Sequence, residues 1–360
     1  MQTRFPFQYG IASMTELPHL ILYAEVEVDG HVATGVAADG LPPKWFTKSP
    51  ETTFEEDLPV MRQAIGHAGE LASAPRRYDS FFSFWKYLYD SQSDWARDEP
   101  TAMLLANFGV SLVERAVLDA ICRAKGTTLF SALRANLLSI DLRQVRPELH
   151  GRTVEQLLPT APPESVTLRH TIGLGDPLTT ADIQPEDRLD DGLPHSLEDC
   201  IRENGLSCFK IKLSGNLDRD HERLTQLADV FRVSLPAGSV ARFTLDGNEN
   251  FRTLAEFRTH WESHCSNPAF RELAAVGLLF VEQPLHRDSA LEAGVADELV
   301  GWPDAPSLII DESDADLDSL PRALALGYSG GSHKNCKGIV KGLANAALLA
   351  TERRMGRAGI

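Results

Sequence analysis

The chain has 360 residues, of which 43% are hydrophobic and 24% charged, a composition typical of a soluble globular protein. Its formal net charge of −16 argues against nucleic acid as a partner, because binding to phosphates needs a basic surface. It has no apolar run near the roughly 20 residues of a membrane span, no signal-type N-terminus, and no metal-ligand spacing among its cysteines, so we expect a cytoplasmic protein with reduced thiols.

The first part of the chain predicts strands followed by helices. Residues 19–38 have the alternation of a β-hairpin, with Asp29-Gly30 as the turn. From about residue 52 to 134 the spacing of apolar residues becomes helical. This order predicts a separate α+β domain, which we place at residues 1–140. A stretch of low periodicity that contains prolines, residues 141–164, is expected to be a linker.

The remaining residues, 165–360, alternate short apolar runs with helical stretches. The runs predict strands at 165–174, 207–213, 241–246, 276–282, 307–311 and, more weakly, 328–334. Alternating strands and helices predict parallel strands in an α/β architecture. No glycine-rich phosphate loop follows any of these strands, which disfavours a dinucleotide-binding fold.

Charged residues stand at the ends of the later strands. They are Lys210 and Lys212, then Asp246, Glu282 and Asp311, and finally Lys334. Because side chains alternate between the faces of a strand, the first two lysines share a face opposite to that of Phe209 and Ile211. In a barrel of alternating strands and helices, inward polar groups of this kind gather at the C-terminal mouth, where active sites lie.

Three carboxylates that converge at such a mouth repel one another unless a cation joins them. The acids at 246, 282 and 311 come from successive strands, and an all-oxygen ligand set suits Mg²⁺, with Mn²⁺ less favoured. Lys210 and Lys212 are expected to lower each other's pKa, so that a lysine can act as a base. The pattern favours removal of a proton beside a substrate carboxylate, through an enediolate that the metal stabilises.

Each of these residues also has a plainer explanation. An acid after a strand often caps the next helix, and lysines can protect an exposed sheet edge. The ordered set favours the metal and acid/base interpretation. His333 has the opposite parity to Lys334 and is interpreted as structural, whereas Asn248 either supports the metal site or shapes its turn. Trp261 and His264 are expected to be packing residues.

Five short motifs carry a resemblance to a known family. They are KIK at 210–212, LDGN at 245–248, VEQP at 281–284, IDES at 310–313 and KNCKG at 334–338. Together with the N-terminal hairpin and the helix at 112–125, they resemble the mandelate racemase/muconate lactonizing enzyme branch of the enolase superfamily. The resemblance implies an N-terminal α+β capping domain followed by a (β/α) TIM-type barrel.

The resemblance also implies a role for each of these charged residues. The metal ligands would be Asp246, Glu282 and Asp311. The opposed acid/base groups would be Lys212 and Lys334, and Lys210 would help to bind the substrate carboxylate. Behind the ligands would lie Asn248 and Glu312.

The implied activity is that of a Mg²⁺-dependent isomerase or lyase acting on a small carboxylate. A racemase, epimerase or cycloisomerase is favoured. The alternatives are an acid-sugar dehydratase and a catalytically silent relative that binds a metal or a carboxylate. A homo-oligomer is also implied by the resemblance.

The sequence departs from the family pattern in the number of strands. Such a barrel has eight strands, whereas about six units can be placed in residues 165–360. We therefore expect that the chain is a fragment, or that another segment closes the barrel. Two loops, Tyr9–Pro18 and Leu41–Lys48, are expected to cover the mouth and to set substrate specificity.

Overall fold

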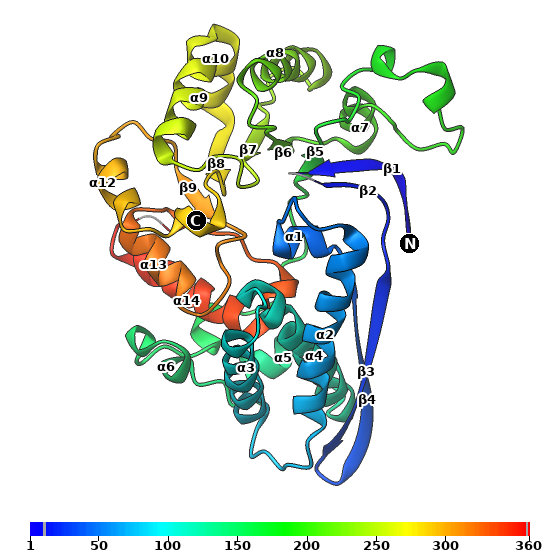
Figure 1. The fold of residues 1–360 in the computed structure, drawn as a ribbon, viewed down its shortest axis with the longest axis vertical. Helices are drawn as coiled ribbons and strands as arrows, with labels where there is room; N and C mark the ends of the chain where they lie inside the picture. Colours follow the sequence, from blue (N-terminus) through cyan, green and yellow to red (C-terminus); the bar gives the residue numbers. More distant parts are fainter. Residues whose placement is uncertain (10–11, 358) are drawn as a thin grey trace.

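The computed structural model describes residues 1–9, 12–357 and 359–360 of the chain. Two antiparallel hairpins and a group of helices form its N-terminal part, and one parallel sheet flanked by helices forms its C-terminal part. Figure 1 shows the second hairpin running along α2 and α4, while α8, α9 and α10 lie at the opposite end of the molecule. This is the mixed α/β architecture predicted from the sequence.

The N-terminal strands form two hairpins. Their bounds are β1 Gln2–Tyr9, β2 Ala12–Glu16, β3 His19–Val28 and β4 His31–Gly40. The second hairpin confirms the one predicted at 19–38, with Asp29 at φ 51° and Gly30 at φ 80° in its turn. The first hairpin was not predicted. Within the expected loop Tyr9–Pro18, residues 10 and 11 lie outside the described residues, Tyr9 ends β1 and Ala12–Glu16 form β2, so only residues 17 and 18 of the described part are without regular structure.

The N-terminal helices pack around α4, which is buried along most of its length. Their bounds are α1 Pro43–Thr47, α2 Phe54–Ser73, α3 Phe81–Asp98, α4 Met103–Ala124 and α5 Leu129–Arg134. Helix α2 begins with a capping box, in which Thr53 and Glu56 satisfy each other's backbone N–H groups. Gly35 lets β4 lie directly on α4, because a Cβ at this position would clash with the carbonyl of Ala116. The second hairpin and the N-terminal helices therefore pack together as one unit.

The C-terminal part is built on a parallel sheet with the strand order β10-β9-β8-β7-β6-β5. The strand bounds are β5 His170–Ile172, β6 Cys208–Lys212, β7 Arg242–Asp246, β8 Leu278–Glu282, β9 Leu308–Ile310 and β10 Gly330–Gly331. Strands of the predicted sheet are thus all present, although the first and last are much shorter than predicted. Short helix α6, Leu142–Val145, lies in the stretch expected to be a linker.

Helices follow the strands, as the alternating pattern predicted. Their bounds are α7 Leu197–Asn204, α8 Leu217–Ser234, α9 Leu254–Ser266, α10 Pro268–Gly277, α11 Arg287–Ala290, α12 Gly294–Val300, α13 Ser319–Leu326 and α14 Ile339–Arg354. Of the helices in the described part of the chain, none combines the length and the apolarity that crossing a bilayer requires.

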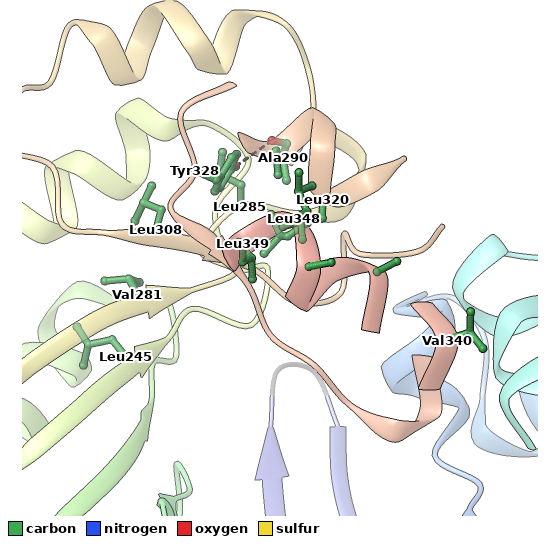
Figure 2. Close-up of a cluster of buried hydrophobic side chains, with 14 of the residues drawn as sticks. Leu245, Val281, Leu285, Ala290, Leu308, Leu320, Tyr328, Val340, Leu348 and Leu349 are labelled. Carbon is green, nitrogen blue, oxygen red and sulfur yellow. Dashed lines mark hydrogen bonds between the residues drawn. The ribbon is translucent and has the colours of Figure 1, made fainter. Parts of the chain in front are cut away.

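The outward faces of the strands form the core with these helices. Phe209 of β6 lies 4.6 Å from Phe231 of α8, measured between ring centroids. Figure 2 shows Leu245, Val281 and Leu308 of successive strands beside the cluster where the Tyr328 hydroxyl donates to the carbonyl of Ala290, at 2.8 Å. The alternation predicted for these strands is confirmed, because the apolar residues face the helices. The polar residues between them must point to the other face of the sheet.

Candidate active site

The register of the parallel strands brings the predicted acids to one level. Lys212 pairs with Asp246, and Asp246 pairs with Glu282, along neighbouring strands. Asp311 follows directly after β9, whose Ile309 pairs with Glu282. Since neighbouring strands lie about 4.8 Å apart, the three carboxylates come within reach of shared partners. Each of the three is at most 1% exposed.

Two lysines from β6 contact these carboxylates, Lys210 both Asp246 and Glu282 and Lys212 only Asp246. Lys210 Nζ is 2.7 Å from Asp246 Oδ2 and 2.8 Å from Glu282 Oε2. Lys212 Nζ is 2.6 Å from the same Asp246 oxygen. On the other flank, Lys334 is ion-paired with Asp311 Oδ2 and lies 4.0 Å from Glu282 Oε1. The structure therefore brings together all six charged residues singled out in the sequence.

These contacts give the three acids different pKa values. Burial raises the pKa of Asp246, but Lys210 and Lys212 outweigh it and hold the pKa at about 2. The pKa of Glu282 is raised by burial and by the charges of Asp311 and Asp246. Asp311 is also buried, yet the lysines around it hold its pKa well below the usual range. Glu282 is thus the carboxylate whose charge is least compensated.

The pKa of Lys210 differs from the prediction. The sequence predicted that the neighbouring lysine and a nearby divalent cation would lower it. Burial does lower the pKa of Lys210, but the charges of Asp246, Glu282 and Asp311 raise it above its ordinary value. For the protein groups alone the prediction is wrong, because the three acids outweigh the one neighbouring lysine. Lys210 is therefore held as an ammonium group between two carboxylates.

The segment Leu41–Lys48, called the cap segment below, covers this site. Trp45 Nε1 donates to Glu312 Oε1 at 3.1 Å, and Lys334 Nζ lies 4.6 Å from the centroid of a Trp45 ring. Lys48 donates to the carbonyl of Asn248. The segment was expected to lie over the mouth as a loop. In the structure most of it is the short helix α1.

Arg287 at the start of α11 holds the cap segment in place through hydrogen bonds. Its guanidinium makes two 2.7 Å hydrogen bonds to Glu249 and donates to the carbonyls of Trp45 and Phe46. No sequence signal identified Arg287, because it follows the strand end by several residues and acts through backbone atoms. Its position makes the cap segment part of the site.

Asn248 and Glu312, predicted to lie behind the ligands, contact each other. Asn248 Nδ2 is 3.4 Å from Glu312 Oε1, and the backbone N–H of Asn248 donates to Asp246 Oδ1 at 2.9 Å. Burial and the nearby charge of Asp311 raise the pKa of Glu312 to about 7. Asn248, Glu249 and Gln283 all have positive φ, at 43°, 63° and 38°. Left-handed backbone at residues other than glycine is uncommon and often occurs at functional sites.

Two residues of the quoted motifs have contacts that the sequence did not predict. Gln283 accepts hydrogen bonds from the backbone N–H groups of Asp311, at 2.7 Å, and Ser313, at 3.1 Å. Lys337 bonds the side chain and the carbonyl of Asp311. His333, by contrast, packs against Gly342 of α14, in agreement with a structural role.

An oxygen-rich site of this kind fits a divalent cation. Oε1 of Glu282 is buried without a hydrogen-bond partner, and two more carboxylates share its lysines. Carboxylate oxygens are ligands that Mg²⁺ prefers. Within residues 1–9, 12–357 and 359–360, no three His, Cys, Asp or Glu side chains already form a metal-holding group. Lys210 bridges two of the carboxylates instead.

A cavity of about 450 Å³ adjoins the site on the side of the N-terminal helices. It is lined by Met103 at the start of α4, by Arg287, and by Glu312 and Ser313 after β9, but by none of the lysines of the site. The cavity is therefore beside the charged cluster and does not contain it.

Comparison with solved structures gives the same fold. A dipeptide epimerase from Methylococcus capsulatus, complexed with Mg and the dipeptide L-Arg-D-Lys, matches with a TM-score of 0.53 and 20% identity, over 98% of this chain and 77% of that chain. A mandelate racemase/muconate lactonizing enzyme from Bordetella bronchiseptica RB50 matches with a TM-score of 0.55 and 14% identity, over 95% and 77%. One from a marine actinobacterium, in complex with magnesium, matches with a TM-score of 0.55 and 14% identity, over 96% and 76%.

No protein-family model matches the sequence, and no curated protein does. The structural matches show that the chain shares the fold of these proteins, an N-terminal α+β domain followed by a TIM-like parallel sheet flanked by helices. The fold implied by the five sequence motifs is thereby confirmed.

Proposed function

We propose that this protein is a Mg²⁺-dependent enzyme that removes and returns the proton on the α-carbon of a substrate carboxylate, as a racemase or epimerase does. One observation carries the proposal. Lys212 and Lys334 approach three buried carboxylates from opposite flanks, separated by the strands β7, β8 and β9. Two amines so placed can serve the two faces of one carbon atom.

Asp246, Glu282 and Asp311 would hold the Mg²⁺. When bound, the metal would supply positive charge to the substrate carboxylate and so lower the cost of removing the neighbouring proton. The buried Oε1 of Glu282 supports this role, since it accepts no hydrogen bond and Lys334 Nζ is 4.0 Å away, so a closer cation would offset the cost of burying it.

The side chains of the protein would move the proton. Lys212, as a neutral amine, accepts the α-proton from one face and becomes an ammonium group. Lys334, as an ammonium group, donates a proton to the other face and becomes neutral. Returning the proton to the face it left restores the substrate, whereas delivery to the opposite face inverts the configuration. Lys210 stays charged and helps to hold the substrate carboxylate.

The cap segment would exclude water while the carbanionic species exists. Trp45 lies against Lys334 and bonds Glu312, so it covers the flank of the site where the second proton is delivered. Water in this position would compete with Lys334 as proton donor. A closed cap segment therefore favours retention of the proton within the site.

Exchange of the α-proton for solvent deuterium tests the proposal. The protein is incubated with Mg²⁺ in D₂O and with N-acylamino acids, dipeptides and sugar acids, and α-deuteration is followed by NMR and mass spectrometry. Dipeptides are included because one protein of similar fold is a dipeptide epimerase. Exchange at the α-carbon supports the proposal. Binding of a carboxylate without exchange of any compound would favour a catalytically silent protein.

Single-lysine variants locate the two bases. Lys212→Ala and Lys334→Ala are each expected to lower epimerisation by at least about 100-fold, because each removes one of two proton carriers. Each variant should still exchange the α-proton of the one stereoisomer that faces its remaining lysine. Lys86→Ala, which removes an exposed lysine paired with Asp90 on α3, is the control and should keep full activity. Full epimerisation by both site variants would exclude the two-base assignment.

A further inference from the structure

We propose that Lys337 is a positioning residue that orients the carboxylate of Asp311 and the backbone that carries Lys334. The inference rests on the proposed function, because it concerns how one presumed metal ligand and one acid/base lysine are held in place. Lys337 is 3% exposed and belongs to the motif KNCKG, in which only Lys334 was expected to act.

The ammonium group of Lys337 makes several short contacts. Its Nζ donates to the carbonyl of Asp311 at 2.7 Å, to Asp311 Oδ1 at 2.9 Å and to the carbonyl of Ser332 at 2.9 Å. Asp314 Oδ2 lies 3.7 Å away. Three donor hydrogens are thus matched by three close acceptors, two of which belong to Asp311.

The two carboxylate oxygens of Asp311 have different partners. Oδ1 accepts from Lys337 and from the Ser332 hydroxyl, at 2.9 Å each. Oδ2 is paired with Lys334 on the side of the other carboxylates. Rotation of the carboxylate would break both contacts to Oδ1, so Lys337 and Ser332 keep Oδ2 directed at the site. Groups that orient a ligand in this way affect metal affinity without touching the metal.

The same lysine also fixes the chain around Lys334. Lys334 lies between Ser332, whose carbonyl Lys337 bonds, and Lys337 itself, whose backbone N–H donates to the carbonyl of Lys334 at 2.9 Å. A turn closed from both ends fixes the backbone from which the Lys334 side chain extends toward Asp311. The position of one proposed acid/base group thus depends on Lys337.

A second buried lysine provides a matched control. Lys341, on the next turn of the chain, is 2% exposed, and its Nζ lies 2.9 Å from Asp314 Oδ1. It contacts Asp314 but neither oxygen of Asp311. If Lys337 served only to neutralise buried acid, removing either lysine would have the same effect. If it orients Asp311, only its own removal should change metal binding.

The experiment compares Lys337→Met with Lys341→Met in the full chain. Binding of Mg²⁺ and of Mn²⁺ is measured by calorimetry, folding by urea denaturation, and kcat and KM by α-proton exchange. For Lys337→Met we expect a Kd for both metals that is about 10- to 100-fold higher, with kcat reduced more than KM is changed. For Lys341→Met we expect lower stability but a metal Kd within about 3-fold of the wild type.

The outcomes separate this inference from the proposed function. A wild-type protein that binds neither metal overturns both. If the wild type binds metal, two results overturn the positioning role alone. In the first, Lys337→Met binds the metal as tightly as the wild type, and in the second, Lys341→Met loses as much metal affinity as Lys337→Met. Should Lys337→Met fail to fold, Ser332→Ala decides, because it removes the other donor to Asp311 Oδ1 at little cost to packing. This variant is expected to raise the metal Kd about 3- to 10-fold, and an unchanged Kd would contradict the inference.

Discussion

Replacement of Arg287 by methionine is expected to lower the free energy of unfolding by about 3 kcal/mol. The guanidinium makes two 2.7 Å hydrogen bonds to Glu249, whose side chain is fully buried, and it donates to two carbonyls of the cap segment. Methionine keeps much of the volume but leaves the carboxylate without its main partner. Breaking a buried ion pair on one side typically costs about 3–5 kcal/mol. Lys48, at 3.7 Å from Glu249, offsets part of this, which places the expected loss near the lower limit.

The double variant Arg287→Met/Glu249→Leu shows whether the unpaired charge is the cause. With both charges removed, the protein should recover most of the loss and lie within about 1–2 kcal/mol of the wild type, the remainder reflecting the two unbonded cap carbonyls. Equilibrium unfolding in urea at pH 7 gives the free energies, and tryptic cleavage after Lys44 or Lys48 reports release of the cap segment. A loss below about 1 kcal/mol for the single variant, or a double variant less stable than the single one, would refute this reasoning.

Two further predictions concern pH. Glu114 on α4 accepts the backbone N–H groups of Ile339 and Val340, and burial raises its pKa to about 7. Between pH 4.5 and 7 the folded protein therefore keeps a proton on Glu114 that the unfolded chain has lost, so the stability that this proton contributes is lost as pH rises through 7. The variant Glu114→Gln lacks one of the two acceptor oxygens. In urea titrations it should be about 1–3 kcal/mol less stable than the wild type at pH 5, with a smaller difference at pH 8. His264 is 3% exposed, and burial lowers its pKa to about 4. The stability that neutral His264 contributes is present above pH 6.5 and is lost as pH falls toward 4. Between pH 7 and 4.5 the free energy of unfolding of the wild type should therefore fall by about 2–3 kcal/mol more than that of His264→Leu. Equal decreases in the two proteins would contradict the lowered pKa of His264.

The sequence predicted the elements whose pattern is local. Alternation in β6 placed Phe209 on the helices and Lys210 toward the acids, and both positions are as expected. Order along the chain predicted that the acids would be neighbours, because parallel strands end at one edge. The charged site could therefore be assembled from strand ends and spacing alone.

Other features depend on contacts between distant parts of the chain. Arg287 donates to carbonyls of the cap segment that are more than 200 residues away in sequence. Because every residue has a backbone carbonyl, the sequence of side chains does not show which carbonyls accept these hydrogen bonds. The first hairpin, Gln2 to Glu16, pairs with an irregular register and has Pro6 inside its first strand, where a proline argues against a strand. The raised pKa of Lys210 depends on three acids from three other strands, so no single motif could predict it.

The balance of charge in the site also bears on the substrate. As ammonium groups, Lys210, Lys212 and Lys334 match in number the three carboxylates at 246, 282 and 311 with which they ion-pair, although the whole chain is at −16. A divalent cation would bring positive charge beyond what these carboxylates balance, and buried charge is tolerated only when it is compensated. An anionic ligand that enters the site would compensate it, whereas a neutral or cationic group would not. This favours binding of the substrate through its carboxylate, next to the carbon from which a lysine would take the proton.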